Sequence, residues 1–233
     1  METLHNGFTL QICPGSFPLS TDSMALADFS RLPANARVLD LGSGCGTLGL
    51  LLCAKDPTCQ VTGVEITPCA HEAALENISR NRIQTRLNSI CDDLCRVPEL
   101  VRPGSFDICI SNPPYFSGGI RSKTNATARS ESYCTLEDLF QSAAWALRYG
   151  GDFYLVHRPE RLSEIFVGAC ARGLEPKRLC LLRHSKDTPV SVVLLQLRKG
   201  GKPGLLWDEL ILHNPDGTPS EDYRRIYHLQ EDA

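Results

Sequence analysis

The sequence lacks any apolar run of about 18 residues, the length a membrane-spanning helix needs. Its first residues carry neither a cationic start nor an apolar stretch of signal-peptide length. We therefore expect a soluble, untargeted protein that does not bind membranes. A large charge of one sign is also missing: 22% of the 233 residues are charged and the net charge is -3. This balance excludes a protein that is basic over its whole surface, so a basic face for nucleic acid would have to be local.

Cysteine pairs with the C-x-x-C spacing of zinc sites are missing too, although the chain has 11 cysteines. This absence argues against structural zinc, and we predict no metal site. The odd number and the scatter through apolar runs are typical of small buried hydrophobic residues and not of a disulfide framework. A reducing compartment, the cytoplasm, is therefore expected.

The pattern that is present alternates short aliphatic or β-branched runs with helical stretches, which predicts an α/β protein with a mostly parallel sheet. Seven strands are expected, at 37–41, 60–64, 87–91, 106–111, 153–157, 179–182 and 190–197. The last two are joined by about seven residues, too few for a crossover helix, so they should form an antiparallel hairpin. A peripheral strand and an exposed tail are expected after residue 203.

Helices are predicted at 47–54, 68–82, 135–149 and 159–172, between these strands. Another should run from Asp22, as its N-terminal cap, to Arg31. Thr135 and Asp138 have the spacing of a capping box.

A glycine-rich segment, VLDLGSGCG at 38–46, follows the first core strand and leads into a helix. Ligands bind at this position in open α/β sheets. Gly42, Gly44 and Gly46 allow positive φ and close approach, and Asp40 places a carboxylate beside the turn, where it can bind an ammonium group. Glu65 ends the next strand, where an acidic side chain can accept both ribose hydroxyls. Together these residues predict a nucleoside-containing ligand.

The same letters also satisfy the dinucleotide fingerprint, as Gly44-x-Gly46-x-x-Gly49 followed by Glu65. A dehydrogenase places its first glycine directly after the strand, so that a helix N-terminus meets the pyrophosphate. Here Gly42 and Ser43 intervene, and the Asp40 carboxylate would face those phosphates unfavourably. We therefore favour a ligand without phosphate.

The most specific segment is Asn112-Pro113-Pro114-Tyr115, at the end of the strand at 106–111. Prolines contribute no donors, so the loop presents acceptors only: the side-chain oxygen of Asn112 and the carbonyl of Pro113. Such a pair suits a planar NH2 group, whose nitrogen lone pair it draws out of conjugation and aims at an electrophile. Tyr115 can stack on a base held there.

These motifs resemble class I S-adenosylmethionine-dependent methyltransferases of the branch that methylates amino groups. More widely, the chain resembles the bacterial valine-tRNA adenine-N6-methyltransferase family through GFTL at 7–10, FPLSTDS at 17–23, ARSE at 128–131, LVHRPERL at 155–162 and RKGGKPG at 198–204. The resemblance implies a Rossmann-like seven-stranded fold, S-adenosylmethionine as cofactor and a tRNA substrate methylated at the adenine next to the anticodon. No obligate protein partner is expected.

The resemblance also assigns residues: Asp22 would neighbour the methionine end of the cofactor, and Asp93, or alternatively Asp92, would approach its adenine. With Asp40, Gly42, Gly44 and Glu65 these form the expected cofactor site, and Asn112, Pro113 and Tyr115 the expected catalytic site. We expect residues 1–35 to cover the cofactor, 36–203 to form the methyltransferase domain and 204–233 to form a peripheral extension.

Two alternatives stay open. An Asn-Pro-Pro-Tyr loop suits the amide nitrogen of a protein glutamine equally, although families with that activity resemble longer chains with an N-terminal helical domain. The other alternative is a noncatalytic RNA-binding or cofactor-sensing module, against which the presence of Asp40, Glu65 and Asn112 weighs.

Positive charge gathers in residues 172–202, where eight Lys or Arg face only Glu175 and Asp187; the eight are Arg172, Lys177, Arg178, Arg183, Lys186, Arg198, Lys199 and Lys202. Arg121, Lys123 and Arg129 add charge after the Asn-Pro-Pro-Tyr segment. RNA phosphates are one partner for such a strip. Protection of a sheet edge against pairing is the other explanation. His157 and His184 are expected to be structural residues, because methylation of an amino group needs no base.

Overall fold

The computed structural model describes residues 1–4, 7–114 and 134–229. Its elements, in chain order, are β1 (Glu2–Thr3), β2 (Thr9–Leu10), α1 (Thr21–Phe29), β3 (Arg37–Leu41), α2 (Thr47–Lys55), β4 (Gln60–Glu65), α3 (Pro68–Arg80), β5 (Leu87–Cys91), η1 (Leu94–Arg96), α4 (Val97–Leu100), β6 (Phe106–Ser111), α5 (Leu136–Ala146), β7 (Leu147–His157), η3 (Pro159–Arg161), α6 (Leu162–Ala171), β8 (Leu174–Ser185), β9 (Val190–Lys199), β10 (Leu206–His213) and α7 (Glu221–Ile226). None of the helices in these ranges is long and apolar enough to cross a membrane.

A central sheet organises the described residues, with eight strands in the order β10-β8-β9-β7-β6-β3-β4-β5. Strands β7, β6, β3, β4 and β5 are parallel neighbours. Strand β9 is antiparallel to both β7 and β8, and β10 runs parallel to β8. The mostly parallel α/β class and the antiparallel hairpin predicted from the sequence are confirmed. The peripheral strand expected after residue 203 joins the same sheet, which brings its strand count to eight.

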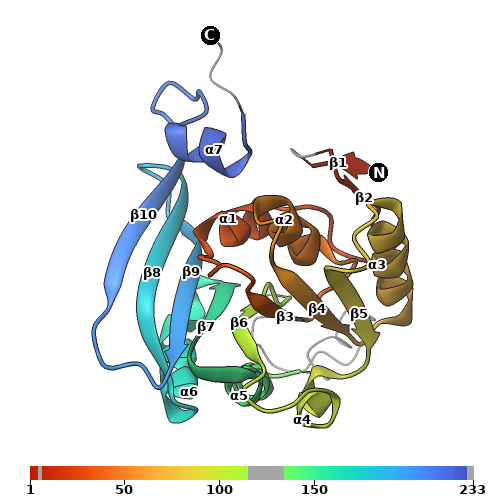
Figure 1. The fold of residues 1–233 in the computed structure, drawn as a ribbon. Helices are drawn as coiled ribbons and strands as arrows, with labels where there is room; N and C mark the ends of the chain where they lie inside the picture. Colours follow the sequence, from red (N-terminus) through yellow and green to blue (C-terminus); the bar gives the residue numbers. More distant parts are fainter. Residues whose placement is uncertain (5–6, 115–133, 230–233) are drawn as a thin grey trace, which may run out of the picture.

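Helices cover both faces of this sheet (Figure 1). On one face α1, α2 and α3 pack over a core that includes Leu26, Leu50 and Ile78. On the other face α5 and α6 bury Phe140, Ile165 and their neighbours against β6, β7 and β9. Because both faces are covered, the central strands are apolar on both sides, which is why they appear in the sequence as nearly continuous hydrophobic runs.

The start of α1 differs from the prediction. Ser20, not Asp22, is the N-terminal cap, because its side-chain oxygen accepts a hydrogen bond from the backbone N–H of Ser23. Asp22 lies inside the first helical turn, where its negative charge complements the helix dipole. The capping box of α5, formed by Thr135 and Asp138, is as predicted.

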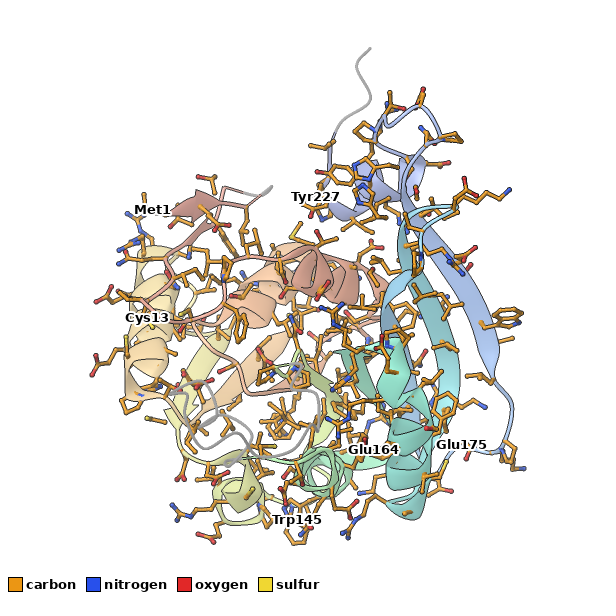
Figure 2. The ribbon with its side chains drawn as sticks, turned by 180° about the vertical axis from the view of Figure 1, so that it is seen from behind. Met1, Cys13, Trp145, Glu164, Glu175 and Tyr227 are labelled. Carbon is orange, nitrogen blue, oxygen red and sulfur yellow. The ribbon has the colours of Figure 1, made fainter. Side chains whose placement is uncertain are left out.

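The segment after β10 folds back onto the first helix. Its helix α7 packs against α1, and the hydroxyl of Tyr227 hydrogen-bonds the hydroxyl of Thr21 over 2.6 Å. Figure 1 shows α7 near one end of β10, and Figure 2 labels Tyr227 there. The C-terminal part of the chain therefore supports the start of α1, two residues from Ser23.

Candidate functional site

The glycine-rich turn connects β3 to α2 with the backbone that its glycines allow. Gly42, Gly44 and Gly46 have φ angles of 75°, 55° and 82°, in the left-handed region that favours glycine. The backbone N–H groups of Gly42 and Ser43 both donate to the carbonyl of Val64 on β4. The turn is thereby drawn over the end of β4, directly beside Glu65.

Glu65 is buried and hydrogen-bonds the backbone of the glycine-rich turn. One carboxylate oxygen accepts from the backbone N–H of Gly44 and the other from the N–H of Thr67, both over 2.8 Å. A carboxylate has about four lone-pair directions, so two backbone donors leave room for ribose hydroxyls on the same oxygens. The ribose-binding role of Glu65 stays a prediction.

Asp40 lies on β3, next to Glu65, and is 1% exposed. Neither of its carboxylate oxygens has a hydrogen-bond partner among the described residues. Burial, followed by the negative charge of Glu65, raises the pKa of Asp40 to about 8. A buried carboxylate without a partner is costly. A cation placed beside it would remove that cost, which fits the ammonium group predicted for the ligand.

Asn112 is positioned by two strands and one helix. The hydroxyl of Ser111, the preceding residue, donates to the carbonyl of Leu41 over 2.7 Å. Since Gly42 follows Leu41, the bond places the start of the glycine-rich turn next to Asn112. The side-chain nitrogen of Asn112 donates to the hydroxyl of Ser23 over 2.9 Å, so the side-chain oxygen faces away from that hydroxyl.

Pro113 and Pro114 border a cavity of about 290 Å3, together with Gly42, His157 and Arg161. Tyr115 lies outside the described residues, as do Arg121, Lys123 and Arg129. The side-chain nitrogen Nδ1 of His157 accepts the backbone N–H of Arg158 over 2.8 Å. Burial and the charge of Arg161 lower the pKa of His157 below its ordinary value, so the ring is neutral at pH 7.

Asp92 and Asp93 follow β5, at the same edge of the sheet. Asp92 forms an ion pair with Arg96, at 3.0 Å, and accepts the backbone N–H of Asp93. Asp93 caps the short helix η1 through the N–H of Cys95. Either carboxylate could contact the adenine of a cofactor, and the choice between them stays open.

The basic residues of 172–202 do not protect an edge of the sheet against pairing. Strands β8 and β9 both lie inside the sheet, and β10 and β5 are its edges. The edge-protection explanation is therefore wrong, because β10 covers the edge that the hairpin would have left open.

Several of these cations bind other parts of the chain. Arg172 pairs with Glu137, Arg183 with Glu209 and Arg198 with Asp152. Arg198 and Lys199 end β9, which is antiparallel to β7, so they lie at the amino end of β7, away from Asn112. Lys186, in the turn between β8 and β9, lies at the carboxyl end.

A larger cavity, of about 680 Å3, lies at the C-terminal ends of α1 and α2. Its lining residues include Phe29, Lys55 and Arg178 and none of the candidate site residues. Lys55 donates to the last carbonyls of α1, and Arg178 lies over the ring of Phe29. These side chains complete the end of α1, whereas the smaller cavity is bordered by Gly42 and Pro113 of the candidate site.

Sequence reasoning predicted the glycine-rich turn, Asp40, Glu65, Asn112 and Pro113 as site residues, and the structure brings all of these to one edge of the sheet; their roles stay predictions. It missed Ser23 and Ser111 as the residues that position Asn112. A Ser or Thr beside a functional loop has no distinctive spacing, so the only available signal was the FPLSTDS segment that contains Ser23.

Both the sequence and the fold are similar to those of known proteins. The family model "Methyltransferase small domain" matches residues 21–166. The tRNA1(Val) (adenine(37)-N6)-methyltransferase of Vibrio parahaemolyticus is 31% identical over 225 residues, which cover 95% of this chain and 91% of that relative. A Bacteroides fragilis protein of the same name is 30% identical over 181 residues, covering 76% of this chain and 75% of its own.

Two solved structures share the fold. A predicted O-methyltransferase from Agrobacterium tumefaciens has a TM-score of 0.74 at 22% identity, covering 89% of this chain and 95% of its own. Geranyl diphosphate C-methyltransferase from Streptomyces coelicolor, crystallised with S-adenosyl-L-homocysteine, has a TM-score of 0.59 at 15% identity and covers 76% of each chain. At these identities the likeness concerns the fold alone.

Proposed function

The chain belongs to the methyltransferase small-domain family and to the family of tRNA1(Val) (adenine(37)-N6)-methyltransferases, and we propose that it methylates the exocyclic N6 amino group of an adenine in tRNA. It is a methyltransferase that uses S-adenosylmethionine. The substrate that its relatives' names indicate is adenine 37, in the anticodon loop of a valine tRNA. We propose the cytoplasm as the place of the reaction.

One observation carries this proposal. The hydrogen bond from Ser111 to Leu41 joins the ends of adjacent parallel strands, so that the glycine-rich turn and the Asn112-Pro113-Pro114 loop start side by side. A nucleoside-binding turn and a loop that presents acceptors to an NH2 group thus share one site. Methyl transfer to an amino nitrogen needs that juxtaposition, because donor and acceptor must be held at near-attack distance.

The residues present fit the cofactor. Asp40 offers a buried carboxylate that lacks a hydrogen-bond partner within the described part of the chain, Glu65 offers carboxylate oxygens beside the turn, and Gly42 and Gly44 leave the turn open to a ligand. We propose that Asp22, Asp40, Gly42, Gly44, Glu65 and Asp93 hold it, with residues 1–35 covering it. When bound, S-adenosylmethionine supplies an electrophilic methyl group on a sulfonium centre.

The role of the chain's own residues is orientation. We propose that the side-chain oxygen of Asn112 and the carbonyl of Pro113 accept the two N–H groups of the target, which turns the nitrogen lone pair toward the electrophile. The hydrogen bond to Ser23 holds the side chain of Asn112 in place at the start of this loop. The target adenine has to leave its stack to reach such a loop, and Tyr115 is proposed to stack on it. No side chain has to act as a base.

The test is to incubate the protein with labelled S-adenosylmethionine and unmodified total tRNA, and to identify the product by nucleoside mass spectrometry. N6-methyladenosine is the expected product, located at adenine 37 of valine tRNA. Methylation of a protein glutamine without any methylation of tRNA would replace this function by the glutamine alternative. Binding of RNA and cofactor without turnover would indicate the noncatalytic module.

A further inference from the structure

The larger cavity, of about 680 Å3, gathers charged side chains of both signs, and its volume is typical of small-molecule sites. These side chains come from α1, α2, β8, β10, α7 and the segments that follow α1 and α2. The cationic ones are Arg31, Lys55, Arg178 and Arg225, and the carboxylates are Asp28, Asp56 and Asp208. Helix α2 leads from the carboxyl end of β3 to the amino end of β4, so Lys55 lies at the amino edge of the sheet. The cavity is therefore at the edge opposite Asn112.

Arg178 is held in this cavity by contacts other than ion pairs. Its guanidinium lies 4.1 Å from the centroid of the Phe29 ring and donates to the carbonyl of Phe29 over 3.2 Å. That bond uses one of its five N–H groups. In the part of the chain that the structure describes, Arg178 forms no ion pair. The ring and the carbonyl thus orient a planar cation whose other donors are available to a ligand.

A second guanidinium belongs to Arg31, which is exposed and follows Phe29 by two residues. Among the described residues the Arg31 side chain has neither a hydrogen bond nor an ion pair. Burial, followed by the positive charge of Arg31, lowers the pKa of Arg178, because the two cations repel each other. Lys55, by contrast, donates to three carbonyls at the end of α1. An anion is therefore needed by the two guanidiniums and not by the lysine.

The carboxylates of the cavity bind other groups and do not neutralise these guanidiniums. Asp28 forms an ion pair with Arg225, at 3.2 Å. Asp56 accepts the backbone N–H and the hydroxyl of Thr58, both over 2.7 Å. Asp208 accepts the backbone N–H of the residue that follows it, over 2.8 Å. Each carboxylate still has lone pairs that could accept a further donor.

We propose that the cavity binds a sugar phosphate, with the phosphate between Arg31 and Arg178 and the sugar hydroxyls on the carboxylates. A phosphate monoester carries a charge of about -1.5 to -2 at pH 7 and three acceptor oxygens. Guanidinium groups bind such oxygens in pairs of parallel hydrogen bonds. A sugar adds the hydroxyl donors that the carboxylates can accept. This site is separate from the methyl-transfer site and does not rest on the proposed function.

Phosphate also occurs in the backbone of RNA, but the lining of the cavity favours a free ester. An RNA backbone is neutralised by cations along its track, whereas three carboxylates interrupt the cations here. Each backbone phosphate is also a diester, with less charge and fewer unesterified oxygens for two guanidiniums. The ligand is therefore a free monoester, and tRNA is tested separately.

Calorimetry on the whole protein, in buffer without phosphate, tests the site with ribose 5-phosphate, inorganic phosphate and ribose. We expect ribose 5-phosphate to bind more tightly than inorganic phosphate, and ribose alone not to bind. Arg31→Ala should weaken binding of ribose 5-phosphate about tenfold or more, as for the loss of a hydrogen bond to a charged group. Arg178→Lys, which keeps the charge but not the planar fork, should also weaken it.

Arg37→Ala is the matched control. Arg37 is another exposed arginine near a phenylalanine ring, 5.5 Å from the centroid of Phe106, and it begins β3 at the same edge of the sheet without lining the cavity. This variant should bind ribose 5-phosphate like the wild type. Absence of ribose 5-phosphate binding, or an equal loss in Arg31→Ala and Arg37→Ala, would overturn the site. Equal affinities for inorganic phosphate and ribose 5-phosphate would overturn the role given to the carboxylates.

Binding of unmodified total tRNA to Arg31→Ala separates the two sources of phosphate. We expect the affinity for tRNA and its dependence on salt to be unchanged. Weaker tRNA binding by this variant, with no binding of ribose 5-phosphate to the wild type, would overturn the free ester and assign the guanidiniums to the RNA backbone. Failure of methyl transfer to tRNA would leave the sugar-phosphate site standing, because its binding is measured without cofactor or RNA.

Discussion

The side-chain amide of Asn112 donates to the hydroxyl of Ser23 over 2.9 Å, although the two residues are 89 positions apart in the sequence. This bond ties the side chain of Asn112, at the end of β6, to the first turn of α1. Ser23 is therefore a positioning residue for the proposed reaction.

Replacing Ser23 with alanine should lower kcat by about tenfold to a hundredfold, the range for misplacing a reacting group, and leave the affinity for S-adenosylhomocysteine unchanged. Asn112→Ala should remove most turnover with the same unchanged affinity. Single-turnover kinetics and calorimetry provide the two readouts. Ser30→Ala is the control, because Ser30 ends the same helix and its hydroxyl donates to the carbonyl of Ala27, away from Asn112. Near-normal activity of Asn112→Ala would remove the orientation mechanism.

Glu65→Ala should weaken cofactor binding by about 1.5 to 3 kcal/mol, the range for a hydrogen bond to a charged group. Part of this loss comes from the turn, since Glu65 also holds the N–H of Gly44. Calorimetry with S-adenosylhomocysteine measures it, and Glu72→Ala, on the exposed side of α3, is the control. The protein should not bind NAD. Tight NAD binding without a response to S-adenosylhomocysteine would contradict the cofactor assignment.

Asp40 should make the stability of the cofactor-free protein depend on pH. Its pKa rises from 3.8 to about 8 on folding, so the native state holds a proton that the unfolded chain releases. Stability from this group is therefore full below about pH 4 and is lost as the pH rises toward 8. The slope is about 1.4 kcal/mol per pH unit.

Asp40→Asn should remove this slope. In urea unfolding from pH 5 to 9, the free energy of unfolding of the variant should rise relative to that of the wild type up to about pH 8. Above that pH the difference between the two should stay constant. S-adenosylhomocysteine should flatten the wild-type curve, because its ammonium group favours the charged carboxylate. Parallel curves for variant and wild type would show that Asp40 titrates near its ordinary value.

The salt dependence of tRNA binding should come from the cations at the carboxyl edge of the sheet and not from all the basic residues of 172–202. Replacing Lys186 and the exposed Arg158 with alanine should shallow the slope of log affinity against log salt by about 0.7 for each phosphate that the variant no longer neutralises. The triple variant at Arg198, Lys199 and Lys202 should keep the wild-type slope, because these residues lie at the opposite end of β9. It should melt earlier, because it cannot form the Arg198–Asp152 ion pair. A slope lowered only by the triple variant would place the RNA at the amino edge.

Much of the fold follows from the sequence, because buried parallel strands are bounded by turn residues. The bounds of β3, β5 and β6 are as predicted. Strand β7 begins six residues earlier than expected, at Leu147, since Gly150 and Gly151 resemble a turn. The structure keeps them in a strand whose register shifts opposite β6, and Gly151 sits there against the backbone of Asp107. Such a bulge depends on the neighbouring strand and has no local signal.

The candidate site, like the fold, could be predicted from the sequence only in part. Glycines, Asp40, Glu65 and Asn112 are visible because their residue types are unusual at strand ends. The contacts that orient them are not visible, since Ser23 reaches Asn112 only after the sheet is assembled. The sequence also did not predict where the basic residues lie. Because β10 pairs with β8, strands that seemed to form the edge of the sheet lie in its interior.

The hydroxyl contact between Thr21 and Tyr227 also bears on how the chain matures during synthesis. The two residues are 206 positions apart, which a ribosome translating about 5 to 20 residues per second covers in about 10 to 40 s. During that interval the first turn of α1, with Ser23 in it, has no α7 to pack against. The contact that α7 gives to the start of α1 is therefore one of the last to form as the chain is made.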